Sequence, residues 1–198
     1  MATVSFTRMS DGTKADYDLL AREEQAFEEG LADRVLDHLR ELEHSTGGYQ
    51  VSRLEHSLQC ATRAEADGAD TDWIVTALLH DIGDMLAPRN HSGMAAAVLE
   101  PYVRAECTWV LRHHGLFQLK YYGQHVGQDP DQRDKFRNDP NFEACVAFCE
   151  RWDETSFDPA YPTRPLEHFE PMVRAVFARL AWDPAVIRDG VRVPPVAA

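Results

Sequence analysis

The residues with the clearest chemical potential in this chain are an adjacent histidine and aspartate at the end of an apolar stretch. His80 and Asp81 follow the apolar run 73–79 and precede Gly83, which suits a turn that ends a helix. Neighbouring residues on a helix point about 100° apart, so both side chains can face one pocket at the helix end. An imidazole beside a carboxylate can bind metal, and the carboxylate can bridge two ions. By itself, the pair is equally compatible with a simple hydrogen-bonded contact.

Three further histidines and one aspartate occur where other helices are expected to begin, end or face the core. His56 lies within an apolar helical stripe, His91 opens a helix after a loop, and His114 ends a helix. Asp153 closes a later helical segment. Helical bundles form dinuclear metal sites by projecting histidine and carboxylate side chains from several helices into a shared core. With the adjacent pair, these residues supply enough ligands for two six-coordinate ions once water or substrate completes the shells.

Helical periodicity predicts the elements that position these residues. Apolar residues recur at three- and four-residue steps, and no segment alternates convincingly as a half-buried strand would. Helices are expected over residues 16–42, 52–67, 71–81, 91–99, 103–114, 142–153 and 170–182. The aromatic stretch 115–123 fits neither period well. The fold class is therefore interpreted as all-α, with one domain over residues 1–198.

The composition restricts the partners that the protein can have. The chain holds 33 Asp and Glu against 20 Lys and Arg, a net charge of −13, which argues against nucleic-acid and anionic-membrane partners. No apolar run approaches a membrane span, and the N-terminus lacks a signal-peptide pattern. The four cysteines show no zinc-site pairing and are expected to be reduced. We expect a cytoplasmic protein that acts on a small molecule. The sequence does not determine its oligomeric state.

The order His, His-Asp, His, His, Asp resembles that of the HD-domain superfamily, all-α metalloproteins that are mostly phosphohydrolases. The likeness covers residues 50–155, which are expected to be the metal-binding core between helical additions at both ends. The chain looks more like the mixed-valent di-iron oxygenases, the branch of myo-inositol oxygenase and hydroxy-aminoethylphosphonate oxygenase. The stretch 51–59 and the ending 151–154 carry this likeness. The sequence also shows no second nucleotide-binding domain and no basic polyphosphate cluster.

The resemblance implies an O2-dependent enzyme that holds two iron ions as an Fe(II)/Fe(III) pair and cleaves a C–P or C–C bond. Asp81 would bridge the ions, and His80 and Asp81 would form the catalytic centre. One ion would be held by His56, His80, Asp81 and Asp153, and the other by Asp81, His91 and His114. His114 is preferred over its neighbour His113 because the oxygenase branch has a helix-ending histidine followed by aromatic residues.

The positions that meet substrate in the better-known oxygenases differ in this chain. Asp84 stands where they carry a cationic or imidazole residue, and Gln118 stands where the phosphonate enzyme has a lysine. Tyr49 occupies the region of a tyrosine and glutamate lid, and His113 is assigned to the pocket. A carboxylate at position 84 would favour an ammonium or a polyol hydroxyl. The expected substrate is an amino or quaternary-ammonium hydroxy-phosphonate, or a related polar alcohol.

Two other functions remain open at this point. A metal-dependent phosphohydrolase would use the same ligands, because two ions can equally activate water for phosphoester hydrolysis. A non-enzymatic binding module is the third interpretation. The lack of a basic phosphate cradle favours the oxygenase, since phosphoryl transfer depends on electrostatic clamps around the phosphoryl charge.

Overall fold

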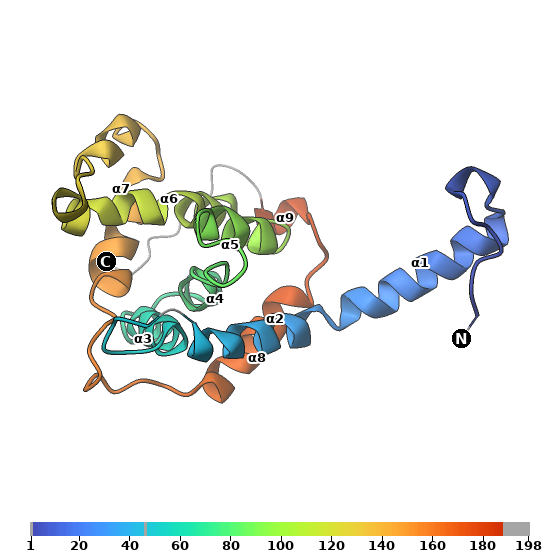
Figure 1. Cartoon of the computed structure of the whole chain (residues 1–198), viewed down its shortest axis with the longest axis horizontal. Coiled ribbons are helices and arrows are strands. Elements are labelled where there is room, and N and C mark those ends of the chain that lie inside the picture. Colours follow the sequence, from blue (N-terminus) through green and yellow to red (C-terminus); the bar gives the residue numbers. More distant parts are fainter. Residues whose placement is uncertain (1, 46, 188–198) are drawn as a thin grey trace.

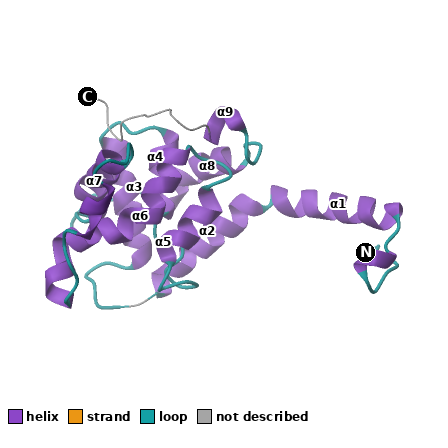
Figure 2. Cartoon of the chain, turned by 90° about the horizontal axis from the view of Figure 1, so that it is seen from above, coloured by secondary structure: helices purple, strands orange, loops and turns teal. Residues whose placement is uncertain are grey.

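The computed structural model describes residues 2–45 and 47–187, and every regular element in this part of the chain is helical (Figures 1 and 2). The longer elements are α1 (Lys14–Glu29), α2 (Leu31–Glu41), α3 (Arg53–Ala66), α4 (Thr71–Leu79), α5 (His91–Leu99), α6 (Ala105–Tyr122), α7 (Phe142–Phe148), α8 (Leu166–Phe177) and α9 (Pro184–Ile187). Short 3-10 turns lie at Met9–Asp11, Leu42–His44, Gly123–Val126 and Gln132–Phe136, and a π-helix, η5, covers Cys149–Asp153. The predicted all-α class is confirmed.

Helix α4 is the centre of the bundle. The side chain of Asp70 caps its first turn by accepting a hydrogen bond from the amide of Trp73. Every residue from Asp72 to Leu79 is buried, since α4 packs against α3, α6 and α8. A helix that is apolar on all sides is stable only when other elements enclose it. Because α4 ends inside the bundle, the residue that follows it, His80, is delivered to the interior.

Two pairs of helices pack most closely, α3 with α4 and α5 with α6 (Figure 1). Helix α3 begins at a serine cap, where the Ser52 hydroxyl accepts from the amide of Glu55. Buried apolar residues from α2 through α8 form one continuous cluster. The four cysteines lie in this core as buried free thiols. Within the described residues, no helix combines the length and apolar character that crossing a bilayer requires.

The single helix expected over residues 16–42 is two helices in the structure. They meet at Gly30, which has φ −84° and ψ 8°, outside the helical geometry of its neighbours. Helix α2 packs on α8 through its apolar stripe, whereas α1 projects from the bundle (Figures 1 and 2). A reciprocal capping box between Thr13 and Asp16 begins α1, and Asp16 is its buried residue. Helix α1 gathers its apolar residues on one face less strongly than α2 does, which fits its position outside the core.

Helix α6 continues eight residues beyond the expected end, to Tyr122, so the prediction that His114 ends a helix is wrong. A glycine inside a helix costs about 1 kcal/mol relative to alanine, and Gly115 suggested such an end. Tertiary packing offsets this cost, because Phe117 in the next turn is fully buried. A Cβ atom at Gly115 would lie 3.0 Å from the Ser92 hydroxyl of α5, so the glycine also allows close approach of the two helices.

Candidate metal centre

Six histidine and aspartate side chains converge beside the C-terminal end of α4. They come from α3, the end of α4, the start of α5, the middle of α6 and the end of η5, and they are His56, His80, Asp81, His91, His114 and Asp153. Their ligand atoms form three overlapping groups, in each of which all atoms lie within 4.8 Å of one another. The structure therefore brings together every residue that the sequence indicated as a metal ligand, and ligation itself stays a prediction.

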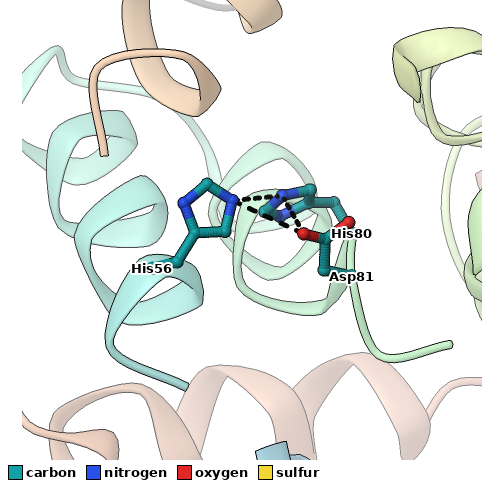
Figure 3. A group of neighbouring side chains, drawn as sticks. All are labelled: His56, His80 and Asp81. Carbon is teal, nitrogen blue, oxygen red and sulfur yellow. Dashed lines mark hydrogen bonds and ion pairs between the residues drawn. The ribbon is translucent and has the colours of Figure 1, made fainter. Parts of the chain in front are cut away.

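The Asp81 carboxylate lies between two sets of imidazoles. Its Oδ2 atom lies 3.5 Å from Nε2 of His56 and 3.4 Å from Nε2 of His80 (Figure 3). Its Oδ1 atom lies 3.5 Å from Nε2 of His91 and 3.4 Å from Nε2 of His114. One carboxylate oxygen thus faces each pair of histidines, as a bridging ligand requires. We call the Oδ2 half, completed by the aspartate of η5, the buried side, and the Oδ1 half the open side.

Asp153 completes the buried side. Its Oδ1 atom lies 3.3 Å from Nε2 of His56 and 3.6 Å from Nε2 of His80. Its Oδ2 atom is buried and has no hydrogen-bond partner among the described residues. Leaving a buried charged oxygen unsatisfied costs about 1–3 kcal/mol or more, which a bound cation would offset. Asp153 is the last residue of the π-helix η5, an element that occurs frequently at functional sites.

Three of the four imidazoles are oriented by backbone carbonyls. The Nδ1 atoms of His56, His80 and His114 lie 2.9, 2.7 and 2.7 Å from carbonyl oxygens, so each donates its Nδ1 hydrogen. The accepting carbonyls belong to Ser156, Ala77 and Leu111. Each neutral ring then presents the lone pair of Nε2 to the cluster. The Nε2 atoms of His56 and His80 lie 3.0 Å apart, a separation that requires a shared proton or a shared metal ion between the two lone pairs, so the donor set is compatible with a divalent metal.

The His91 ring contacts side chains instead, and the Ser92 hydroxyl lies 3.2 Å from its Nε2 atom. Its Nδ1 atom lies 3.6 Å from Oδ1 of Asp84, and Oδ2 of Asp84 lies 3.0 Å from Nε of Arg53. The turn after α4 approaches α5 closely, since a Cβ atom at Gly83 would lie 2.7 Å from the Cα and carbonyl oxygen atoms of His91. Glycine at this position therefore allows the turn that places Asp84 beside the open-side histidine.

The charges in the cluster are strongly coupled through proximity. Burial raises the pKa of Asp81, but the neighbouring histidines outweigh it and hold that pKa well below its usual range. Burial lowers the pKa of His80, yet the carboxylates of Asp81 and Asp153 outweigh burial and raise it well above its usual value. Burial is the largest influence on His91, whose pKa is lowered. The carboxylates are thus anionic, and a metal ion would replace the positive charge of the His80 proton.

The cluster opens into a cavity of about 360 Å³. Beyond the ligands, its wall carries four aromatic rings, those of Tyr49, Tyr121, Tyr122 and Phe157. The Tyr49 ring stacks on Phe157 with centroids 5.0 Å apart, and Phe157 stacks on His56 at 4.4 Å. The wall also holds one guanidinium, from Arg53, and the carboxylate of Glu154. The cavity therefore combines an aromatic surface with one fixed charge of each sign beside the metal ligands.

Of the four residues that the sequence analysis assigned to substrate binding, two line the cavity and two lie elsewhere. Tyr49 and Gln118 line the cavity. Asp84 and His113 are absent from the cavity wall among the described residues. Asp84 faces Arg53 and the open-side histidine, and His113 stacks on Trp109 with centroids 4.1 Å apart. These contacts assign Asp84 and His113 to supporting the site and the core, and substrate contact stays an untested prediction for both.

Three cavity residues escaped the sequence analysis, namely Arg53, Glu154 and Phe157. Arg53 lies three residues before His56, so both face the same side of α3, and this spacing was a usable signal. Glu154 directly follows the last ligand, and its position depends on the π-helical turn before it. Phe157 lies in an irregular segment whose course no periodic pattern predicts.

Comparison with known proteins agrees with this geometry. The sequence matches the HD domain family over residues 53–154, just over half of the chain and a span that includes all six converging residues. It is also 29% identical over 159 residues to the [1-hydroxy-2-(trimethylamino)ethyl]phosphonate dioxygenase (glycine-betaine-forming) of Leisingera caerulea, with 64% of this chain and 80% of that protein aligned. These likenesses support an HD-type enzyme, an oxygenase or a hydrolase. The chain belongs to the HD domain family.

Proposed function

We propose that this protein is an O2-dependent di-iron oxygenase that oxidises a small hydroxylated substrate and cleaves its C–P or C–C bond. The character of the cavity wall carries this proposal. Phosphoryl transfer requires several cationic groups around the transferring phosphate. Beyond the metal ligands this wall is largely aromatic, with Arg53 as the one guanidinium among the described lining residues. The similarity to a phosphonate dioxygenase supports the same choice.

The donor set is compatible with iron. Imidazole and carboxylate ligands without thiolate suit iron, zinc or manganese. The residues that would hold the two ions are His56, His80, Asp81, His91, His114 and Asp153. When bound, iron would supply the one-electron and O2 chemistry that side chains cannot provide. The protein contributes three imidazoles oriented by backbone carbonyls, the shared Asp81 carboxylate and a cavity with aromatic side chains beside the ligands.

The aromatic wall supports a substrate with an ammonium group. Tyr49, Tyr121, Tyr122 and Phe157 offer ring faces of the kind that attract quaternary ammonium groups, and Glu154 adds a negative charge. The Leisingera caerulea relative is named for a trimethylamino hydroxy-phosphonate. We therefore propose an amino or quaternary-ammonium hydroxy-phosphonate, or a related polar alcohol, as the substrate class. In this proposal the ammonium group lies against the aromatic wall, and Asp84 does not contact it.

A metal-dependent phosphohydrolase is the second candidate. The observation that favours it is the ligand arrangement itself, since two ions held by one bridging carboxylate can also activate water for phosphoester hydrolysis. The two candidates differ in their need for O2, and that difference is measurable.

The test combines metal analysis, spectroscopy and turnover. Freshly purified protein is analysed for iron, oxidised mildly and examined by electron paramagnetic resonance. Consumption of O2 is then followed with 1-hydroxy-2-(trimethylamino)ethylphosphonate as substrate. We expect two iron ions per chain, a coupled Fe(II)/Fe(III) signal and O2 consumption that follows substrate loss. Anaerobic hydrolysis of p-nitrophenyl phosphate at a comparable rate, without O2-dependent turnover, would contradict the oxygenase and favour the hydrolase.

A further inference from the structure

The cavity contains a cationic side chain that the metal centre does not use as a ligand. Arg53 is the first residue of α3, one helical turn before His56, and it reaches the cavity wall. No lysine and no second arginine lines the cavity among the described residues. The Arg53 side chain is largely buried, with 21% of its surface exposed. A cation that is partly withdrawn from water interacts strongly with a nearby anion, because solvent screening is reduced.

Three contacts hold the guanidinium of Arg53 in place. Its Nε atom lies 3.0 Å from Oδ2 of Asp84, and its Nη1 atom lies 3.4 Å from Oδ2 of Asp81. Its Cζ atom lies 4.7 Å from the centroid of the Tyr49 ring. The described contacts use Nε and Nη1, and none of them uses Nη2. The guanidinium is therefore oriented from one edge while donors on the other edge remain for a ligand.

The partner of Nη1 is also a metal-ligand atom. Oδ2 of Asp81 is the oxygen that faces His56 and His80 on the buried side. Ligation of a cation by this oxygen would compete with its hydrogen bond from Arg53. A hydrogen of Nη1 would then be available to the cavity as well, while Asp84 still holds Nε. Two parallel N–H donors match the geometry of phosphonate and carboxylate oxygens.

We propose that Arg53 binds the anionic group of the substrate, a phosphonate or a carboxylate. In this proposal Asp84 is the positioning residue that holds the Arg53 guanidinium. This inference deepens the proposed function and rests on it for the substrate class. The aromatic wall and Glu154 take the ammonium part of the molecule, and Arg53 takes the anionic part. Asp84 acts through Arg53 and does not touch the substrate.

Equilibrium binding of two probes tests Arg53 without turnover. Methylphosphonate carries the anion alone, and choline carries the ammonium and hydroxyl alone. Calorimetry on the iron-loaded full chain, kept anaerobic, gives both affinities for Arg53→Gln, Arg53→Lys and a control, Arg112→Gln. Arg112 pairs with Glu100 at 2.7 Å on the surface outside this cavity. Arg53→Gln should weaken methylphosphonate binding by roughly tenfold or more, since hydrogen bonds to charged groups are the strong ones.

The remaining outcomes separate ligand recognition from a structural role. Choline affinity and iron content should stay unchanged in Arg53→Gln, and Arg53→Lys should be intermediate toward methylphosphonate. Equal losses for both probes, loss of iron, or an unchanged methylphosphonate affinity would overturn the proposal. So would failure of methylphosphonate to bind the unaltered protein. Because these measurements need no O2 chemistry, they can fail while the oxygenase proposal holds, and the reverse also applies.

A double-mutant cycle tests the positioning role of Asp84. Asp84→Asn should weaken methylphosphonate binding severalfold in the parent protein, since Nε of Arg53 loses its charged partner. With every variant loaded to two iron ions per chain, the same change should have no further effect on this affinity in the Arg53→Gln background. Additive effects of the two changes would show that Asp84 does not act through Arg53.

Discussion

The two sides of Asp81 are built from similar ligands but are held in different ways. On the buried side, His80 is fully buried and Asp153 is 4% exposed. On the open side, the His91 side chain is 28% exposed and lines the cavity. Backbone carbonyls fix both buried-side histidines, whereas the carboxylate of Asp84 faces the ring of His91. Three of the four histidines, including His114 on the open side, are therefore fixed by backbone carbonyls, and only His91 is contacted by side chains instead.

This difference indicates that the two sides of the metal centre respond differently to substitutions and to bound molecules. The Nδ1 atom of His80 donates to a carbonyl of its own helix turn, so the ring cannot shift unless the helix end moves. The His91 ring instead faces two side chains, the Ser92 hydroxyl and the carboxylate of Asp84, and Asp84 also pairs with Arg53 at the cavity wall. We expect the buried side to retain its ion under most changes and the open side to respond to the contents of the cavity. The following predictions, from the largest expected effect to the smallest, test this comparison.

Removal of the shared carboxylate should abolish the difference between the sides. Asp81→Ala deletes the group whose two oxygens face both pairs of histidines, so we expect the metal content to fall from two ions per chain to none. Plasma mass spectrometry of the purified variant measures this content. Asp37→Ala, which removes an exposed carboxylate on α2, is the control. Near-full metal in Asp81→Ala would refute the bridging assignment.

Removal of one histidine from each side should produce unequal losses. His80→Ala deletes a fully buried ring and leaves two carboxylates without their counter-charge, so we expect loss of an ion and a fall in the free energy of unfolding of roughly 2 kcal/mol or more. His91→Ala should lose one ion with a smaller stability change, because that ring is partly exposed. Metal analysis and urea unfolding of metal-stripped protein measure both quantities. Equal stability losses would contradict the comparison.

Substitution of each of the two adjacent histidines of α6 should distinguish a metal ligand from a packing residue. His114→Ala should lose the open-side ion, since its Nε2 lies 3.4 Å from Asp81. His113→Ala should keep both ions and lose about 1 kcal/mol of stability, the typical contribution of an aromatic stack such as that on Trp109. Metal content and urea unfolding again provide the measurements. Metal loss in His113→Ala with retention in His114→Ala would show that the neighbouring histidine is the ligand.

The smallest effect is expected from the side-chain support of the open side. Asp84→Asn keeps the shape of the residue but removes the charge that faces Nδ1 of His91, and such outer contacts are typically worth 10–100-fold in metal affinity. We expect the affinity for the more weakly held ion to fall by about tenfold, while the tighter ion is retained. Competition with a chelator measures the two affinities. A matched loss of both ions would mean that the sides are not independent.

The sequence indicated the six converging residues because most of them are short-range features, and their role as ligands stays a prediction. His80 and Asp81 follow an apolar run, and His91 opens a helix, so residue type and helical spacing place each of them at an end that can face a pocket. The all-α class follows from the same periodicity. The choice of His114 over His113 came from family resemblance, and the structure places His114 in the cluster and His113 against Trp109.

Only the tertiary structure decided the features that depend on contacts between distant segments. Periodicity could not show the break at Gly30, because the apolar pattern continues across it while only α2 has a partner to pack on. The extension of α6 past Gly115 depends on burial of Phe117, which outweighs a local helix penalty of about 1 kcal/mol.

The ion-pair partner of Asp84 was also determined only by the tertiary structure. The family resemblance implied that Asp84, three residues after Asp81, would place a carboxylate in the cavity. In the folded chain, the packing of α3 against α4 brings Arg53 within 3.0 Å of Asp84 and turns that carboxylate toward His91. Local sequence thus determined which residue types stand at the helix ends. The orientation of the Asp84 carboxylate depends on Arg53, which α3 places beside it. Local sequence cannot predict such an ion pair, because its two residues are far apart along the chain and meet only in the folded protein.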